Sequence, residues 1–133
     1  MSNKQQTISP VDGSIYLERD YANSKQVDLA LDLAHRSQKR WGQVPLEERK
    51  GLCSGAVQAL ELNKDQIAQE LCWQMGRPIK YAAGEVNSFA ERAEHMVAIA
   101  DTALAPLQQD EKEGFIRYIR REPVGVVLVI APW

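Results

Sequence analysis

Apolar residues recur at helical spacing soon after the first twenty residues of this 133-residue chain. Ser24 is a suitable capping residue for the first helix, and Gly42 and Pro45 mark its end. The residues that share its apolar face are Val27, Ala30, Leu31, Ala34 and Trp41. Such a stripe normally packs against a core, so we expect Trp41, its largest member, to be a buried core residue.

Two further helical stretches follow the first. The second begins at Pro45, a residue favoured in the first helical turn, and its two apolar stripes meet at a joint formed by Asn63 and Lys64. Gly76, with Pro78 two residues later, is typical of a helix end. The third stretch covers residues 81–104. The pattern therefore predicts a mainly α fold with three long helices.

Short β segments are predicted at both ends of the chain. Asp12 and Gly13 suit a tight turn, so residues 7–10 and 14–18 are predicted to form a hairpin. Near the other end, the polar residues 108–114 indicate an exposed loop, and residues 115–123 resume as a strand. Residues 124–130 are almost continuously Val, Leu and Ile, as is typical of a strand buried on both faces of a parallel sheet.

Composition excludes several classes of protein. The chain is 44% hydrophobic and 26% charged with a formal net charge of −2, which is ordinary for a globular domain. No basic surplus favours nucleic acid as a partner. The first ten residues lack the apolar core of a signal peptide, and the apolar run at residues 124–130 is far too short to span a membrane. We expect a cytoplasmic protein with no nucleic-acid or membrane partner.

The residues by themselves define no catalytic constellation. Cys53 and Cys72 fit a reducing compartment, and both lie in apolar helical stripes, where a small core residue is the favoured interpretation over a catalytic one. Neither they nor the isolated His35 and His95 have metal-ligand spacing, so no metal site is predicted. Glycine-rich phosphate loops and the nucleophile-elbow motif are absent from the sequence. A helical scaffold is all that these observations indicate.

The last thirteen residues, "REPVGVVLVIAPW", carry the most specific signal. They closely resemble a segment of the aldehyde dehydrogenase superfamily in which an Arg-Glu-Pro-x-Gly-Val strand leads into Pro-Trp-Asn. The segments "SPVDGSIY", "PLEERK" and "MGRPI" agree with the same family in the same order along the chain. The resemblance covers nearly all of the sequence.

This resemblance implies the N-terminal part of an α/β aldehyde dehydrogenase fold. Residues 1–113 would be the N-terminal hairpin and helical part of the NAD(P)-binding domain, and residues 114–123 a strand of the oligomerisation arm. Residues 124–133 would be the first, truncated strand of the dinucleotide-binding sheet. The residues expected to line the cofactor pocket are Ile130, Ala131, Pro132 and Trp133.

The family's catalytic asparagine, lysine, glutamate and cysteine would all follow Trp133. We therefore expect the first quarter of an NAD(P)-dependent aldehyde dehydrogenase, with no catalytic residue of its own, no activity alone and no bound cofactor, although the complete enzyme would use NAD or NADP. The alternative is a free-standing helical protein that serves in assembly or partner binding. Because a lone apolar strand has open edges, we also expect a homo-oligomer formed through residues 115–130, from Phe115 to Ile130.

Overall fold

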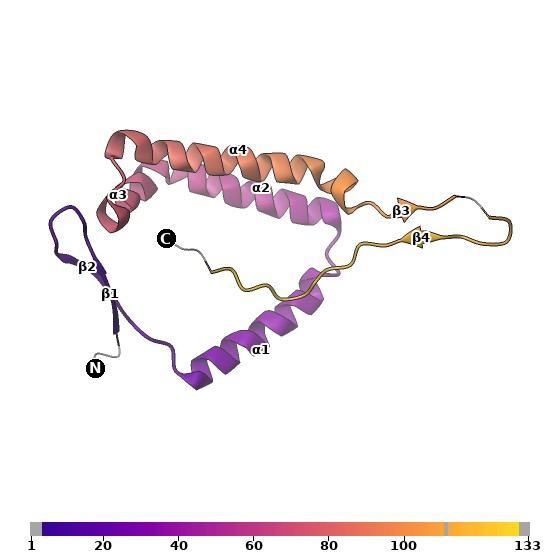
Figure 1. Ribbon diagram of the computed structural model, residues 1–133, viewed down its shortest axis with the longest axis horizontal. Coiled ribbons are helices and arrows are strands. Elements are labelled where there is room, and N and C mark those ends of the chain that lie inside the picture. Colours follow the sequence, from indigo (N-terminus) through magenta and orange to yellow (C-terminus); the bar gives the residue numbers. More distant parts are fainter. Residues whose placement is uncertain (1–3, 111, 131–133) are drawn as a thin grey trace.

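In the computed structural model, which describes residues 4–110 and 112–130, four helices account for most of the chain and short strands for a small part. The elements are β1 (Lys4–Ile8), β2 (Ile15–Asp20), α1 (Ser24–Trp41), α2 (Leu46–Leu62), α3 (Lys64–Met75), α4 (Ile79–Leu104), β3 (Leu107–Gln108) and β4 (Tyr118–Ile119). Figure 1 shows α2 and α4 side by side, with α1 apart from them. The predicted fold class, mainly α with short β segments, is confirmed.

The N-terminal hairpin is confirmed and is slightly longer than predicted. Strands β1 and β2 pair antiparallel from Lys4 opposite Asp20 to Ile8 opposite Ile15. In the turn, the Asp12 carboxylate accepts hydrogen bonds from the backbone N–H of Ser14 at 2.9 Å and from its hydroxyl at 2.7 Å. Gly13 has a φ of 76°, which a glycine adopts without steric cost. The turn chemistry therefore fixes the hairpin locally.

The first helix begins at Ser24, but its capping residue is Asn23 and not Ser24 as predicted. The Asn23 side chain accepts a hydrogen bond from the Gln26 backbone N–H at 3.0 Å, and the Gln26 side chain accepts one from the Asn23 N–H at 2.9 Å. This reciprocal pair satisfies two backbone groups, whereas a serine one position later would satisfy at most one. Asn23 therefore sets the start of α1.

The joint predicted at Asn63 and Lys64 separates two helices, α2 and α3. Asn63 is the C-cap of α2, and its side chain donates a hydrogen bond to the Ala59 carbonyl at 2.7 Å. Helix α3 ends at Gly76, whose φ of 72° is left-handed and whose N–H donates to the Cys72 carbonyl. Both helix ends thus follow from local chemistry that the sequence displays.

The buried core lies between α2, α3 and α4. Helix α4 packs along α2 and also against α3. The buried apolar residues are Val57 of α2, Ala68 of α3, and Ala82, Val86 and Ala90 of α4. The three α4 residues are four apart, so they form one stripe on the helix. Small side chains at these positions let the helix backbones approach closely.

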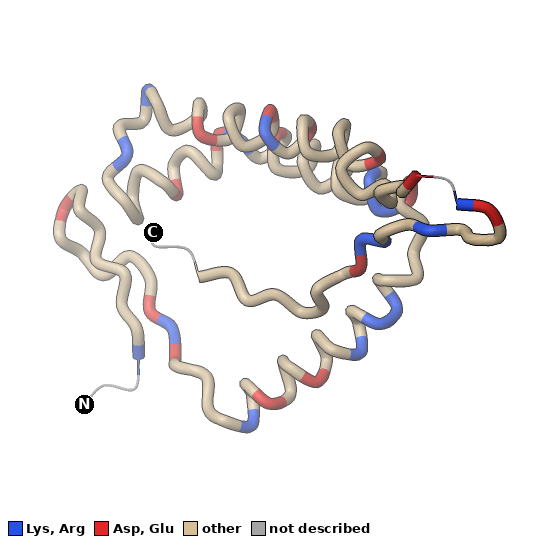
Figure 2. The backbone as a smooth tube through the Cα atoms, turned by 45° about the vertical axis from the view of Figure 1, so that its right-hand side comes forward, with Lys and Arg blue, Asp and Glu red and all other residues tan. Residues whose placement is uncertain are grey.

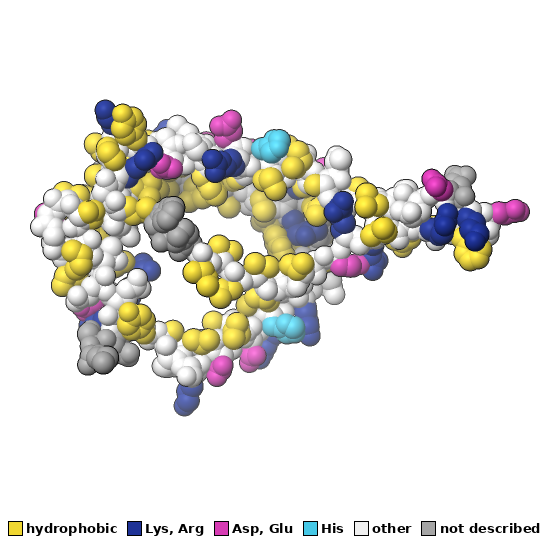
Figure 3. All heavy atoms as spheres, in the orientation of Figure 1, with side chains coloured by type: hydrophobic (Ala, Val, Ile, Leu, Met, Phe, Trp, Pro, Cys, Tyr) yellow, Lys and Arg dark blue, Asp and Glu magenta, His cyan; other side chains and the backbone are white. Residues whose placement is uncertain are grey.

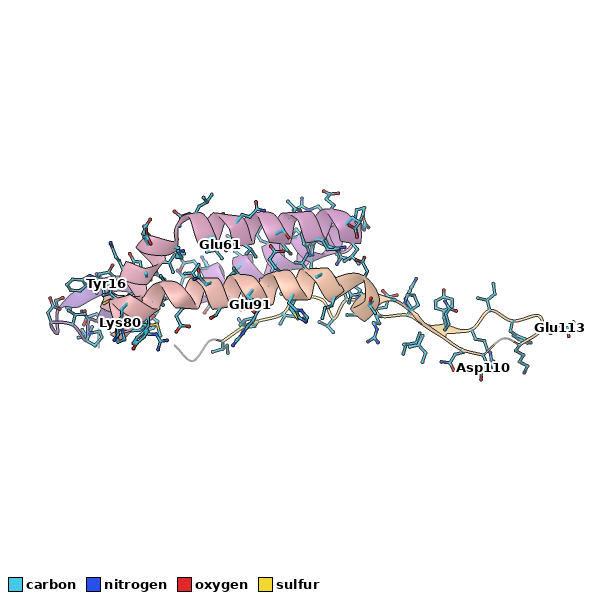
Figure 4. The ribbon with its side chains drawn as sticks, turned by 90° about the horizontal axis from the view of Figure 1, so that it is seen from above. Tyr16, Glu61, Lys80, Glu91, Asp110 and Glu113 are labelled. Carbon is cyan, nitrogen blue, oxygen red and sulfur yellow. The ribbon has the colours of Figure 1, made fainter. Side chains whose placement is uncertain are left out.

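The hairpin packs against the corner between α3 and α4. Tyr16 of β2 stacks on Trp73 of α3 with ring centroids 6.2 Å apart and an interplanar angle of 10°. Ser9 is fully buried, and a Cβ added to Gly76 would lie only 3.0 Å from Cγ of Pro10. Tyr16 and Lys80 lie at this end of the molecule, whereas Asp110 and Glu113 lie at the far tip of the β3–β4 arm (Figure 4).

The predicted C-terminal strands differ most from the structure. Of the strand expected at residues 115–123, only Tyr118–Ile119 is a strand, and it pairs with Leu107–Gln108. Gln108 therefore belongs to a strand and not to the loop that was expected at residues 108–114. Residues 120–130 are not part of any strand in the described chain. The reason is physical: a strand is defined by ladder hydrogen bonds, and no neighbouring segment among the described residues offers them.

Trp41 is also not the core residue that its helical stripe predicts. Its side chain is 43% exposed, and none of the described residues of α1 is buried. An amphipathic stripe is buried only where another element covers it, and α1 lies apart from the packed helices (Figure 1). The stripe is therefore present in α1 but uncovered.

None of the described helices has the length and apolar character that crossing a lipid bilayer requires.

Candidate functional site

The candidate site is the segment formed by residues 120–130, which we call the terminal segment. It leaves β4 without forming a further strand and runs between α1 and the packed helices (Figure 1). Arg120 and Glu122 form an ion pair at its start. Beyond Glu122 the described residues carry no charge, as the uniformly tan tube in Figure 2 shows. The segment is thus an uncharged, extended chain with a charged base.

Apolar side chains of the terminal segment are open to solvent. Val124 is 91% exposed and Ile130 is 83% exposed, although both are of a type that is normally buried. Figure 3 shows hydrophobic atoms along this segment and along the side of α1 that faces it. The backbone of residues 120–130 forms no hydrogen bond with the backbone of other described residues. Both the side chains and the backbone edges are therefore available for contacts.

One cavity of about 540 Å³ lies between the terminal segment and the C-terminal half of α1. Its lining residues are Ala34, Ser37, Gln38, Arg40, Trp41, Val44, Gly125 and Val126. Gly125 has a φ of 100°, a backbone conformation that would strain any residue with a side chain. The cavity is mostly apolar and contains no carboxylate, histidine or cysteine, so it offers neither a nucleophile nor a general base.

The predicted cofactor residues are only partly described. Ile130 is at the end of the terminal segment with its side chain exposed. Ala131, Pro132 and Trp133 lie outside the described residues. Among the described residues, no glycine-rich turn leads from this segment into a helix N-terminus, the arrangement that binds a dinucleotide pyrophosphate. The described chain therefore supplies one side of a cofactor pocket at most.

The two cysteines are free and lie in the helical part. Cys53 is exposed on α2 and Cys72 is partly buried on α3. Neither thiol hydrogen-bonds to a histidine or a carboxylate within the described ranges, an arrangement that would activate a nucleophile. Within those same ranges, no group of three or more His, Cys, Asp or Glu side chains is placed to hold a metal ion. Cys72 is only partly buried, and the exposed Cys53 is not the small core residue that the sequence predicted.

A charged cluster that the sequence analysis missed links α2 to α4. The Lys50 ammonium donates hydrogen bonds to the carboxylates of Asp101 at 2.6 Å and Glu47 at 2.8 Å. Its bond to Asp101, and secondarily to Glu47, raises the pKa of Lys50, and the same ammonium lowers the pKa of Asp101. Glu47 lies three residues before Lys50 on one helix and could have been found from spacing, but Asp101 is 51 residues away.

Comparison with known proteins identifies the family. The model of the aldehyde dehydrogenase family matches residues 1–133, the whole chain. The chain therefore belongs to the aldehyde dehydrogenase family.

Individual relatives agree with this assignment. An aldehyde dehydrogenase of Deinococcus radiodurans is 28% identical over 126 residues, which are 94% of this chain and 24% of that protein. The structure of PnpE in complex with nicotinamide adenine dinucleotide is 26% identical, with a TM-score of 0.82 over 91% of this chain and 25% of its own. A succinic semialdehyde dehydrogenase from Streptococcus pyogenes, solved with NADP+, is 27% identical. Its TM-score is 0.74, and the match covers 82% of this chain and 24% of that protein's chain.

The chain spans about a quarter of the length of the curated relatives it matches. The TM-scores show that its described helices and strands have nearly the arrangement found within those larger structures.

Proposed function

We propose that this chain is the N-terminal portion of an NAD(P)-dependent aldehyde dehydrogenase, an enzyme that oxidises an aldehyde to a carboxylic acid. The observation that carries the proposal is the family match over all 133 residues. It is supported by the likeness to PnpE, a structure that contains nicotinamide adenine dinucleotide, and to a dehydrogenase solved with NADP+. In such an enzyme the dinucleotide accepts the hydride of the aldehyde.

Three successive parts of the chain are proposed to have different roles. Residues 1–113 are the hairpin and helical part of the NAD(P)-binding domain, residues 114–123 belong to the oligomerisation arm, and residues 124–133 become the first strand of the dinucleotide-binding sheet. Ligands of open α/β sheets bind beyond the carboxyl ends of strands, and in the proposed sheet Ile130 would be at such an end. Its side chain is 83% exposed in this structure. Ile130, Ala131, Pro132 and Trp133 are proposed to line the pocket for NAD or NADP.

The chain by itself is proposed to be inactive and to bind no dinucleotide. Neither described cysteine has a partner that would generate a thiolate, and the cavity beside the terminal segment holds no acid or base. A single wall of a pocket leaves the pyrophosphate without a helix N-terminus. Titration calorimetry of the purified chain with NAD and with NADP tests this, and micromolar binding of either would contradict it.

A chimera tests the positive half of the proposal. The first quarter of the Deinococcus radiodurans aldehyde dehydrogenase, the part that this chain matches, is replaced by residues 1–133. The chimera is expected to reduce NAD or NADP in the presence of aldehyde, whereas the relative lacking its first quarter is expected to be inactive. A chimera that folds, by circular dichroism and gel filtration, but neither binds dinucleotide nor oxidises aldehyde would contradict the proposed function.

A second candidate function is a free-standing helical protein for assembly or partner binding. The observation that favours it is the exposed apolar surface of α1, where Leu31 is 59% exposed. Thermal unfolding of the 133-residue chain separates the two candidates. A single cooperative transition together with an inactive chimera would favour the binding protein, and an active chimera would favour the enzyme.

A further inference from the structure

Gly125 differs from the other described glycines of positive φ, because no turn explains its conformation. The described residues with a positive φ are all glycines, namely Gly13, Gly76, Gly114 and Gly125. Gly13 lies in the hairpin turn, Gly76 ends α3, and Gly114 lies in the turn at the tip of the β3–β4 arm. Gly125 lies within the terminal segment, where the structure has neither a turn nor a bend. Its φ of 100° therefore serves another purpose.

Lack of space does not explain the glycine. A Cβ added to Gly125 would meet no described atom within 4 Å. The backbone conformation does explain it, since a residue with a side chain rarely adopts a φ of 100°. A glycine inside a run of Val, Leu and Ile also weakens a strand, because it has no side chain to pack. The residue type at position 125 is therefore set by the backbone conformation that the chain needs there.

The φ of Gly125 sets the direction of the side chains that follow it. Val126 comes next and lines the cavity beside α1 together with Trp41. Its side chain is 47% exposed, less than the 63% of Val127. Side chains of a strand alternate between its two faces, so in the proposed strand the direction of Val126 also fixes that of Ile130, four residues later. A φ of about −120° at residue 125, the ordinary value for a parallel strand, would rotate all these side chains relative to α1.

We propose that Gly125 is a positioning residue for the dinucleotide pocket. Its positive φ turns the proposed first strand so that Val126 faces α1 and Ile130 takes its place in the pocket wall. This inference rests on the proposed dehydrogenase function, in which residues 124–133 form the first strand of the sheet. Gly125 acts through the strand that it orients and needs no contact with the dinucleotide. A residue with a side chain at this position is expected to displace the pocket wall, because a shift of one residue changes the face of every side chain that follows.

Two matched alanine substitutions test the proposal in the chimera, in which residues 1–133 form the first quarter of the Deinococcus radiodurans enzyme. Gly125→Ala is the test, and Gly13→Ala in the hairpin turn is the control. Gly13 is a matched position because its φ is 76° and an added Cβ would also meet no described atom within 4 Å. Titration calorimetry measures the dissociation constants for NAD and for NADP. Gly125→Ala is expected to raise the constant of the bound dinucleotide by about tenfold or more, and Gly13→Ala to change it by less than about twofold.

Circular dichroism and thermal unfolding give a second measurement that separates positioning from stability. Both substitutions strain the backbone in the same way, so both variants are expected to keep the helix content of the chimera and to melt at similarly lowered temperatures. Only Gly125→Ala is expected to weaken dinucleotide binding as well.

Three results would overturn the proposal. The first is a folded Gly125→Ala variant that binds dinucleotide as tightly as the unsubstituted chimera, and the second is equal weakening by Gly13→Ala. The third is a Gly125→Ala variant that does not fold although Gly13→Ala does, because Gly125 would then be needed for folding and not for positioning. An unsubstituted chimera that folds but neither binds dinucleotide nor oxidises aldehyde would contradict the proposed function, and with it this proposal.

Discussion

Helix α4 and helix α1 carry apolar stripes of the same kind, yet only one of the two is buried. Ala82, Val86 and Ala90 of α4 are at most 6% exposed, because α2 and α3 cover them. On α1, Val27 and Leu31 are 46% and 59% exposed, because nothing in the described chain lies over them. Burial, and with it most of the hydrophobic stabilisation, depends on the covering element and not on the stripe.

The two regions are expected to contribute differently to the stability of the isolated chain. The unit formed by α2, α3 and α4 contains the core and the link from Lys50 to Asp101, so it is expected to determine the stability of the isolated chain. Helix α1 and the terminal segment contribute exposed apolar surface and are expected to gain their stabilisation from a partner. Substitutions in the two regions should therefore differ sharply in cost.

The largest expected effect comes from placing a carboxylate on each stripe. Val86→Asp would bury a charge at a position that is 5% exposed and is expected to cost more than about 3 kcal/mol, enough to unfold much of the chain. Val27→Asp, on the open stripe of α1, is the control and is expected to change stability by less than about 0.5 kcal/mol. Urea unfolding followed by circular dichroism measures both. Equal costs would show that α1 is covered in solution.

The next effect concerns the corner where the hairpin meets α3. Gly76→Ala would place a Cβ 3.0 Å from Pro10 at a φ of 72° and is expected to destabilise the chain by about 1–3 kcal/mol. Gly84→Ala in α4, where nothing lies within 4 Å, is expected to stabilise by about 0.5–1 kcal/mol. Thermal unfolding shows whether each substitution stabilises or destabilises the chain. If Gly76→Ala stabilises it, the hairpin does not pack at this corner.

Trp41 sharpens the comparison because it lies between the two regions. It lines the cavity beside the terminal segment and another cavity beside α2 and α4. A fully buried tryptophan costs about 3–5 kcal/mol when truncated to alanine, whereas Trp41→Ala at 43% exposure is expected to cost below about 2 kcal/mol. Urea unfolding gives the value. A cost of about 3–5 kcal/mol would show that Trp41 is a core residue after all.

The smallest expected effect is electrostatic and depends on pH. Because the pKa of Asp101 is lowered by Lys50, its contribution is present above the ordinary carboxyl pKa and is lost as the pH falls through the lowered value. The raised pKa of Lys50 acts at the other limit: its contribution is lost only as the pH rises through that raised value. Lys50→Met is therefore expected to lower the melting temperature slightly across neutral pH.

The difference between the parent chain and Lys50→Met should shrink as the pH falls below the ordinary carboxyl range. Lys25→Met on α1 removes the same charge from a lysine that has no ion pair to a described residue, so it is the control. Melting temperatures from acid to neutral pH measure both variants. A difference that stays constant into strong acid would show that the bond to Asp101 contributes nothing.

The sequence alone determined the elements whose causes are local. Asp12 and Gly13 form the hairpin turn through hydrogen bonds to a residue two positions away, and Gly76 ends α3 by taking a left-handed conformation. The segment closing the chain was also enough to suggest the family that the comparison confirmed. Even the wrong choice of Ser24 over Asn23 as helix cap was an error of one residue, because both can supply a capping oxygen.

Only the tertiary structure decided which apolar surfaces are covered and which strands exist. The run at residues 124–130 has every local property of a buried strand, yet ladder hydrogen bonds require a second segment that no local pattern supplies. The same holds for the stripe that ends at Trp41 and for the bond from Lys50 to Asp101, which joins residues 51 positions apart. Periodicity and capping act over a few residues, whereas burial and pairing are properties of two surfaces that meet.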